Sequence, residues 1–406
     1  MKYIVPDAME FSTSNAIEET LDEWIPKAYN EGDEVKVSAD KKKYKFSGAD
    51  GVQSTITPSL DPDLWVSAPL NQYAMFVGTK STETTNADTI NTVFKAKNID
   101  TISLFNVSAK SVEIKLKHNL ITTENVGAGN GVLTVFSTTT NVLPFSGFIE
   151  IWVNGVKEAE DINGDGLFED AAGSYVASGT VDYTTGSFTV NFSSPIANAQ
   201  VVEVKYNALV YSVVQDLTYD DLNSFGDYLY TEQELRDTLT SILPVSMLNE
   251  VVNAMTEEQI YAQFTANPPI YHDVDIHLNI INTGDIAKCG YVVVGRKRDL
   301  GASAIDGFKL GLKTTATRER DIWGDTTLTA GSGYDLMDVP VFIKDVQVDV
   351  VKSRLKKNMG TPIVAIADDS DNPMYKSASI YGFFFDLEIP IHPAATKYNL
   401  RVESLI

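Results

Sequence analysis

Apolar side chains recur at every second position in segments spread along most of this chain. Residues 101–107 read TISLFNV and residues 111–117 read SVEIKLK, and residues 272–280 and 339–350 repeat the alternation. A period of two is that of a strand with one buried and one exposed face, which is typical of antiparallel sheets. We therefore predict a mainly β protein. With 406 residues the chain is too long for one ordinary core, so we expect several domains.

The order of strand and helix signals predicts five segments. Residues 71–120 hold too few strands to close a sandwich, and residues 269–406 also look incomplete. An insertion at a loop tip is tolerated because closure entropy grows slowly with loop length. We predict a small three-stranded N-terminal module over 1–70 and a split antiparallel β-sandwich formed by 71–135 and 269–406. Between its halves we predict an inserted immunoglobulin-like β module over 136–212 and a short helical segment over 213–268.

The helical segment 213–268 has a distinct pattern. Thr231 to Glu234 reads TEQE, which has the form of a capping box that opens a helix. Leu235 and Leu239 follow at helical spacing. We expect one or more short helices here.

The charge of the chain excludes some partners. The formal net charge is -23, whereas nucleic-acid binding requires a surface that neutralises phosphates. We therefore expect no nucleic-acid partner. No stretch approaches 18 apolar residues, and the N-terminal residues lack an apolar run, so we expect no membrane insertion and no signal peptide. A single cysteine, Cys289, excludes an intrachain disulfide and fits synthesis in a host cytoplasm.

One acidic loop has a spacing suited to calcium. Acidic and amide oxygens at alternating positions, followed by glycines, are a common way for a chain to wrap Ca²⁺. The twelfth position of an EF-hand would need a bidentate Glu, and Ala172 stands there. The alternative is a solvated turn. The candidate calcium ligands are Asp161, Asn163, Asp165, Glu169 and Asp170.

Signals for catalysis are weak. None of the four His lies in a Ser or Cys nucleophile motif, and His272 and His277 would face opposite sides of one strand. The chain has no zinc motif of the His-Glu-x-x-His type and no phosphate loop. We predict that the protein is not an enzyme and has no cofactor, with calcium as the one exception to test.

Aromatic residues near the N-terminus form a familiar pattern. Trp24, Tyr29, Tyr44 and Trp65 surround a Gly32-Asp33 turn. This pattern resembles the small chitin-binding-type carbohydrate modules of chitinases and phage tail proteins, although a run of three lysines replaces the family's short turn. The resemblance implies that Trp24, Tyr44 and Trp65 contact a glycan or a partner, because aromatic rings stack on sugar faces. The alternative is that these rings form the core of a tiny domain.

Two further stretches look similar to bacteriophage virion proteins. Residues 65–90 resemble a group of phage virion proteins in which a carbohydrate-binding module leads into a β-sandwich. The likeness continues in residues 289–295, 298–301, 320–325, 361–364 and 380–383. Residues 179–186 are similar to a hairpin that recurs in tail and baseplate proteins. The resemblance brings no catalytic residue with it.

These observations predict a structural protein of a bacteriophage tail, tail tip or baseplate. Such a protein would reside in the virion as a homo-oligomer, bound to other phage tail proteins and in contact with host surface polysaccharide. A receptor-binding, lectin-like protein is the alternative. A polysaccharide depolymerase is a weaker one, because no acid and base pair can be placed from the sequence.

Overall fold

The computed structural model describes most of the chain. No helix within this described part is long and apolar enough to cross a membrane. The described residues are 1–77, 83–161, 163–170, 176–216, 262–268, 270–271, 273–303, 307–320, 326–329, 331, 333–344, 348–367, 378–388 and 395–405.

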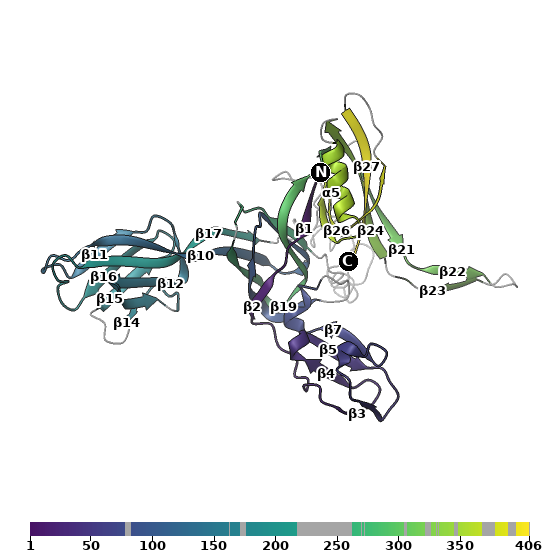
Figure 1. The fold of residues 1–406 in the computed structure, drawn as a ribbon, viewed down its shortest axis with the longest axis horizontal. Helices are drawn as coiled ribbons and strands as arrows, with labels where there is room; N and C mark the ends of the chain where they lie inside the picture. Colours follow the sequence, from purple (N-terminus) through teal and green to yellow (C-terminus); the bar gives the residue numbers. More distant parts are fainter. Residues whose placement is uncertain are drawn as a thin grey trace, which may run out of the picture.

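The prediction of a mainly β fold is confirmed, and the strands gather into four lobes (Figure 1). A central sandwich joins the other three, which we call the N-terminal module, the inserted module and the C-terminal lobe. The inserted module and the N-terminal module extend from the centre in different directions (Figure 1). Each lobe has a hydrophobic core of its own.

The central sandwich combines strands from both sides of the insertion. Its core packs apolar residues of 75–116 against residues of 266–294. The longest strand, β19, pairs with β8 and β10 and then with β9. A bulge near Gly284, whose φ is positive, separates these two parts of β19. The strands are β2 (Glu10–Ser14), β8 (Thr84–Ala96), β9 (Thr101–Ser108), β10 (Ser111–Ala128), β17 (Val201–Asp216), β18 (Ala262–Ala266) and β19 (Val274–Asp299).

The inserted module is itself a small sandwich. One sheet contains β11, β16 and β15, and the facing sheet contains β12, β13 and β14 with the far halves of β10 and β17. Because β10 and β17 pair in both lobes, they connect the module to the centre without a flexible linker. Its own strands are β11 (Val135–Thr139), β12 (Pro144–Val153), β13 (Val156–Asp161), β14 (Glu169–Asp170), β15 (Val176–Asp182) and β16 (Ser187–Phe192).

The N-terminal module contains a three-stranded sheet, as the sequence predicts, and a second pair of strands. The sheet has the order β4-β5-β7, and the pair is β3 with β6. Helix α1 then leads into β8. The elements are β3 (Lys27–Tyr29), β4 (Glu34–Val37), η1 (Ser38–Asp40), β5 (Lys42–Phe46), β6 (Val52–Ser54), η2 (Pro58–Leu60), β7 (Trp65–Pro69) and α1 (Asn71–Ala74).

The C-terminal lobe packs strands against one amphipathic helix, α5 (Val348–Asn358). Val351 and Leu355 face the lobe core. A narrow ribbon formed by β21 and β24, continued by the hairpin β22–β23, projects away from the lobe (Figure 1). The strands are β1 (Lys2–Pro6), β20 (Ala302–Ser303), β21 (Lys309–Thr314), β22 (Thr317–Arg320), β23 (Thr326–Thr329), β24 (Gly333–Lys344), β25 (Ile363–Ile366), β26 (Ser379–Glu388) and β27 (Ala395–Ser404).

The C-terminal lobe differs from the predicted second half of the sandwich. Only the part of 269–406 up to the end of β19 joins the central core, and the later strands enclose a core of their own. The N-terminal strand β1 pairs with β19 and β25, so residues 2–6 lie in this lobe and outside the predicted 1–70 module. Alternation identifies a strand but leaves its partner open, because partners are chosen by tertiary packing.

The helical prediction is wrong at both ends of its range. Residues 213–216 continue β17, and residues 262–266 form β18. The capping box and the leucines of 231–239 lie outside the described residues. The strand expected over 339–350 ends at Lys344, and Val348 and Val350 belong to α5.

Candidate functional site

The aromatic residues of the N-terminal module form its core. Tyr44 and Trp65 are each only 3% exposed, and they pack with Tyr29 and Phe46. Trp65 meets Tyr29 and Phe46 edge-on, with ring centroids 4.9 Å apart in both cases. Its indole nitrogen donates to the Ser54 hydroxyl. Neither Tyr44 nor Trp65 presents a ring face to solvent, which favours the core interpretation over sugar stacking.

Trp24 differs from the other two candidates. It is partly buried against the same core, and its indole nitrogen has no hydrogen-bond partner within the described part of the chain. A buried N–H normally finds a partner. Of the three candidates, Trp24 is the one that is not fully buried, although its indole nitrogen itself is covered.

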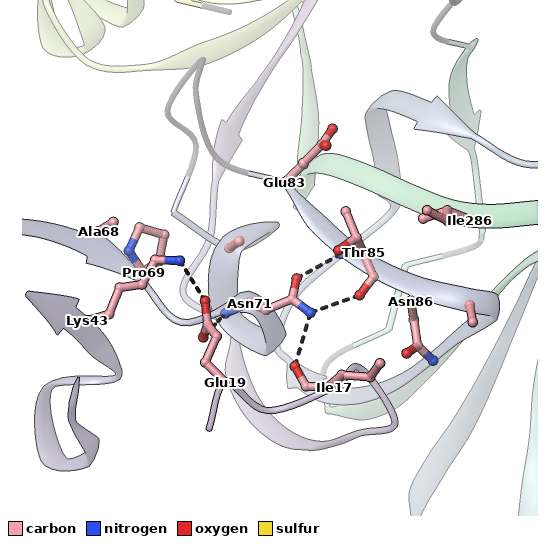
Figure 2. A pocket seen from close by; sticks show the side chains of 12 residues that line it. Ile17, Glu19, Lys43, Ala68, Pro69, Asn71, Glu83, Thr85, Asn86 and Ile286 are labelled. Carbon is pink, nitrogen blue, oxygen red and sulfur yellow. Dashed lines mark hydrogen bonds and ion pairs between the residues drawn. The ribbon is translucent and has the colours of Figure 1, made fainter. Parts of the chain in front are cut away.

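A cavity of about 640 Å³ lies where the N-terminal module meets the central sandwich (Figure 2). Glu19 and Lys43 come from the module side, and Thr85 and Ile286 come from the sandwich. The Lys43 ammonium and the Glu19 carboxylate form an ion pair of 2.7 Å. The cavity therefore lies at the contact between the N-terminal module and the central sandwich, which we call the N-terminal joint.

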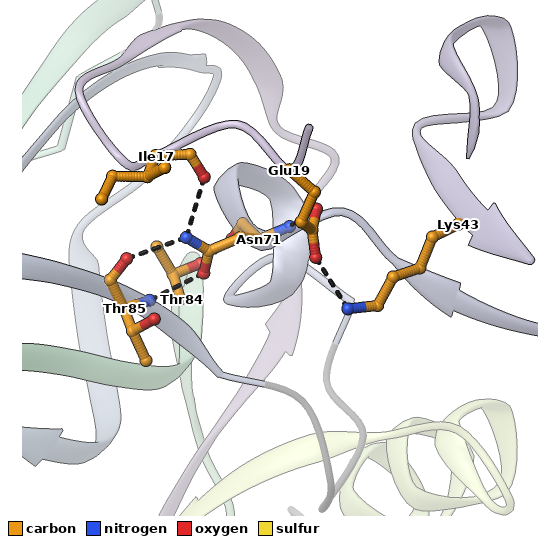
Figure 3. Close-up of polar contacts among 6 residues, drawn as sticks. All are labelled: Ile17, Glu19, Lys43, Asn71, Thr84 and Thr85. Atoms are coloured by element: carbon orange, nitrogen blue, oxygen red, sulfur yellow. Dashed lines mark hydrogen bonds and ion pairs between the residues drawn. The ribbon is translucent and has the colours of Figure 1, made fainter. Parts of the chain in front are cut away.

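Asn71 at the start of α1 holds that joint together (Figure 3). Its side-chain nitrogen donates to the carbonyls of Ile17 and Thr85, and its oxygen accepts from the Thr85 N–H at 2.8 Å. The backbone of Asn71 also donates to Glu19 and accepts from the Thr84 hydroxyl. Since the polar groups drawn here are paired with one another, the geometry favours a rigid joint over a ligand site.

The acidic loop uses its oxygens internally. Asp161 is buried, and its carboxylate accepts from the N–H groups of Gly164 and Gly166 and from the Tyr183 hydroxyl. Asp165 accepts from the Leu167 N–H, and the Asn163 amide donates to Glu169. Among the described residues no three His, Cys, Asp or Glu side chains are arranged to hold a metal ion. These contacts favour the turn, while calcium binding, including any part for Asp170, remains a prediction.

A second polar region lies on the central sandwich beneath the inserted module. Asp275, His277 and Asn279 alternate along β19, so they share one face of the sheet. The neighbouring strand β10 places Lys117 opposite Asp275 and Lys115 opposite His277. We call the three β19 residues the polar row.

The inserted module covers the polar row by means of a bulge. β12 pairs with β17 at Pro144 and again at Ile149, and residues 145–148 leave that ladder. Gly147 allows the excursion because its φ is +77°. The bulge brings the Phe145 ring to 4.4 Å from the His277 ring and places Phe148 3.8 Å from the Lys117 ammonium.

Two cavities open beside the polar row. One, of about 700 Å³, is lined by His277 and Asn279 together with Phe145 and Phe148. The other, of about 450 Å³, is lined by Asp275 and Lys117. Residues of one strand therefore line both cavities, and the polar row runs from one to the other.

The polar row contains unpaired atoms. Asp275 is 8% exposed, and its Oδ2 pairs with the Lys117 ammonium at 3.0 Å. Its Oδ1, together with Nε2 of His277 and Oδ1 of Asn279, has no hydrogen-bond partner in the part of the chain that the structure describes. Burial lowers the pKa of His277 to about 4, and the nearby lysines Lys117 and Lys115 add to this effect. His277 is therefore neutral at pH 7.

The sequence analysis discounted His277 as a metal ligand and did not single out the polar row. The available signal was the alternation of Asp, His and Asn at positions 275, 277 and 279, which reads as the solvent face of a strand. Cys289 is fully buried, and burial raises the pKa of its thiol to about 12, which agrees with a structural role.

Neither a scan against protein-family models nor a search of curated proteins finds a match for this chain. Its function is therefore inferred from its own residues.

Proposed function

We propose that this chain is a non-enzymatic structural protein of a bacteriophage tail, and that it works as a symmetric oligomer. The sequence resemblances described above point to virion proteins. The architecture supports a structural role, because β10, β17 and β19 pass through more than one lobe and give the molecule a continuous frame.

The observation that carries the proposal is the projecting ribbon. Every residue of β21 is exposed, and the apolar side chains Leu310 and Leu312 are 44% and 82% exposed. Both leucines lie on β21, and among the described residues β21 forms strand pairing with β24 alone. A two-stranded ribbon is marginally stable by itself. Exposed leucines on such an edge favour association with another chain.

A second copy of this chain is the partner that fits best. Lys309 and Lys313 flank the two leucines, whereas the chain as a whole carries a net charge of -23. Lys313 pairs with Glu403 of the same subunit at 3.4 Å, so Lys309 offers the positive charge of this strand to the acidic surface of a second subunit. Phe342 and Phe385 of the same lobe are also exposed. Repeated head-to-tail contacts between identical subunits generate a closed ring when the rotation from one subunit to the next closes.

The test is the mass of the purified protein by light scattering, followed by negative-stain imaging. We expect a discrete ring or trimer for the natural sequence and a monomer for Leu312→Asp. Leu60→Asp is the matched control, since Leu60 is equally exposed on the N-terminal module and should leave the oligomer intact. A natural protein that stays monomeric and never joins a phage particle would overturn the proposal.

A further inference from the structure

We propose that the C-terminal lobe carries a basic face that docks the acidic inserted module of a second copy of this chain. The inference rests on the proposed oligomer and names the two surfaces that meet in it. The basic face consists of side chains at the end of β19 and on α5, namely Arg296, Arg298, Lys352, Arg354, Lys356 and Lys357.

The two elements of the basic face lie side by side. The Arg354 guanidinium donates to the Asp299 carbonyl at 3.1 Å, which holds α5 against the end of β19. Arg298 lies opposite Tyr3 in the pairing of β19 with β1, and residues opposite one another share a face of the sheet. The Tyr3 hydroxyl in turn accepts from the Asn358 amide at the end of α5. Arg298, and the arginine two positions before it, therefore lie on the side of the sheet that α5 covers.

The cations of the basic face have no carboxylate partners. All six are exposed, and none forms an ion pair with another residue of the described chain. Asp299 and Asp349 are the acidic residues of residues 296–299 and of α5. The basic face is therefore opposite in sign to the chain as a whole, which has 32 basic and 55 acidic residues. Unpaired cations are available to an acidic partner.

Apolar side chains among these cations favour a protein as the partner. Val350 and Met359 are 49% and 50% exposed. Val350 lies one helical turn before Arg354, so the two share one side of α5. A polymer of phosphate or sulfate groups has no apolar group to cover these side chains, and the net charge of -23 repels it. An acidic protein surface with an apolar side chain of its own fits better.

The leucines of the ribbon lie on the same side of the sheet as α5. Leu310 is opposite Met337, and Met337 packs in the lobe core with Val351 and Leu355 of α5. Leu312 follows two positions later on the strand and so has the same orientation. A partner on this side of the lobe can therefore contact the basic face and the ribbon together.

The inserted module offers the complementary surface. Residues 129–200 contain eight acidic residues and one lysine. The bridge between Leu167 and Thr180 holds the acidic loop along β15, and its register places Asp165 near Asp182. Both carboxylates are exposed, and Leu167 between them and the rest of the loop is 54% exposed. Carboxylates around an apolar side chain match the cations around the exposed apolar side chains of α5.

The two complementary surfaces belong to opposite sides of the molecule. The inserted module and the C-terminal lobe extend from the central sandwich in different directions (Figure 1). The basic face therefore meets the inserted module of another copy and not its own. Such a contact is head to tail, and it closes into a ring when the rotation from one copy to the next closes.

The first test reverses the charge of the basic face in the full chain and measures assembly by sedimentation equilibrium. One variant combines Lys352→Glu, Lys356→Glu and Lys357→Glu. We expect the dissociation constant of the oligomer to rise by about a hundredfold, because like charges then face one another. The control combines Lys42→Glu, Lys45→Glu and Lys97→Glu, which are exposed outside the C-terminal lobe. It changes the net charge equally and should assemble as the natural chain does.

The second test restores complementarity. Asp165→Lys with Glu169→Lys reverses the acidic loop and should weaken assembly by itself. A chain that carries this pair together with the three glutamates on α5 has both surfaces reversed and should assemble again. This recovery cannot come from misfolding, and circular dichroism checks the fold of each variant.

The outcomes separate this inference from the proposed oligomer. A natural protein that stays monomeric would overturn both. A natural protein that assembles, with the variant reversed on α5 assembling equally well, would overturn the docking surface alone. If that variant instead loses binding to a heparin column, the basic face serves a polyanion. A folded chain with both surfaces reversed that stays monomeric would show that the inserted module is not the partner.

Discussion

The N-terminal module and the inserted module meet the central sandwich in opposite ways. At the first joint, Asn71 and Glu19 pair the polar groups of both lobes with one another. At the second joint, the bulge of β12 covers a polar row whose acceptors lack partners among the described residues. A fully paired contact is suited to fixing an orientation, whereas buried acceptors without a partner are unfavourable by the free energy of their lost hydration. The comparison shows that two joints of one molecule can differ in how completely their polar groups are paired.

The largest expected effect concerns the aromatic core of the N-terminal module. Trp65→Ala removes a ring packed against Tyr29 and Phe46 and should destabilise the module by about 4 kcal/mol. Chemical denaturation followed by tryptophan fluorescence measures this change. Trp24→Ala is the control and should have a clearly smaller effect, since Trp24 is partly exposed. Equal effects would contradict the core interpretation of Trp65.

The ion pair of the polar row should give the next largest effect. Lys117→Met leaves the Asp275 carboxylate buried without its partner and should destabilise the protein by about 3 kcal/mol. The double variant Lys117→Met with Asp275→Leu should recover most of that loss. Urea denaturation of the single and double variants checks both statements. A double variant as unstable as the single one would show that the pair itself stabilises the fold.

The N-terminal joint should respond more moderately. Asn71→Ala removes three side-chain hydrogen bonds and should destabilise this contact by about 2 kcal/mol, at roughly 0.5–1.5 kcal/mol for each bond. Asn86 lines the same cavity and donates one bond, to Thr89, so Asn86→Ala should have a smaller effect. Hydrogen exchange at Thr85 measures the opening of the joint. Unchanged protection in Asn71→Ala would argue against its role.

A pH dependence is expected at the second joint. The pKa of His277 is lowered to about 4 in the folded protein, below the ordinary value of 6.5. The unfolded chain therefore binds more protons between these values, so stability falls as pH drops from about 6.5 to about 4. His277→Gln should reduce this dependence. Thermal unfolding at pH 7, 5.5 and 4 for both proteins tests it, and parallel pH profiles would contradict the assignment.

The sequence could predict the strands far better than their partners. Alternation correctly indicated β9, β10 and the first part of β19, because a half-buried strand imposes a period of two wherever it lies. It could not place β1 in the C-terminal lobe, since that depends on pairing with residues about 300 positions away. Val348 and Val350 fit a strand pattern over a short window, yet they begin a helix because α5 packs Val351 and Leu355 onto the lobe core.

The candidate residues show the same difference between what the sequence predicts and what tertiary packing decides. Trp24, Tyr44 and Trp65 stood out by residue type, but residue type does not report whether a ring is covered, and packing buried two of the three. Asp275, His277 and Asn279 are ordinary residues for an exposed strand face. The fold places Phe145 against His277 and Phe148 against Lys117, which lies opposite Asp275. By itself the sequence determined the β character, because hydrophobic alternation is local. Tertiary structure decided which polar groups were buried unpaired, because burial depends on segments distant in the chain.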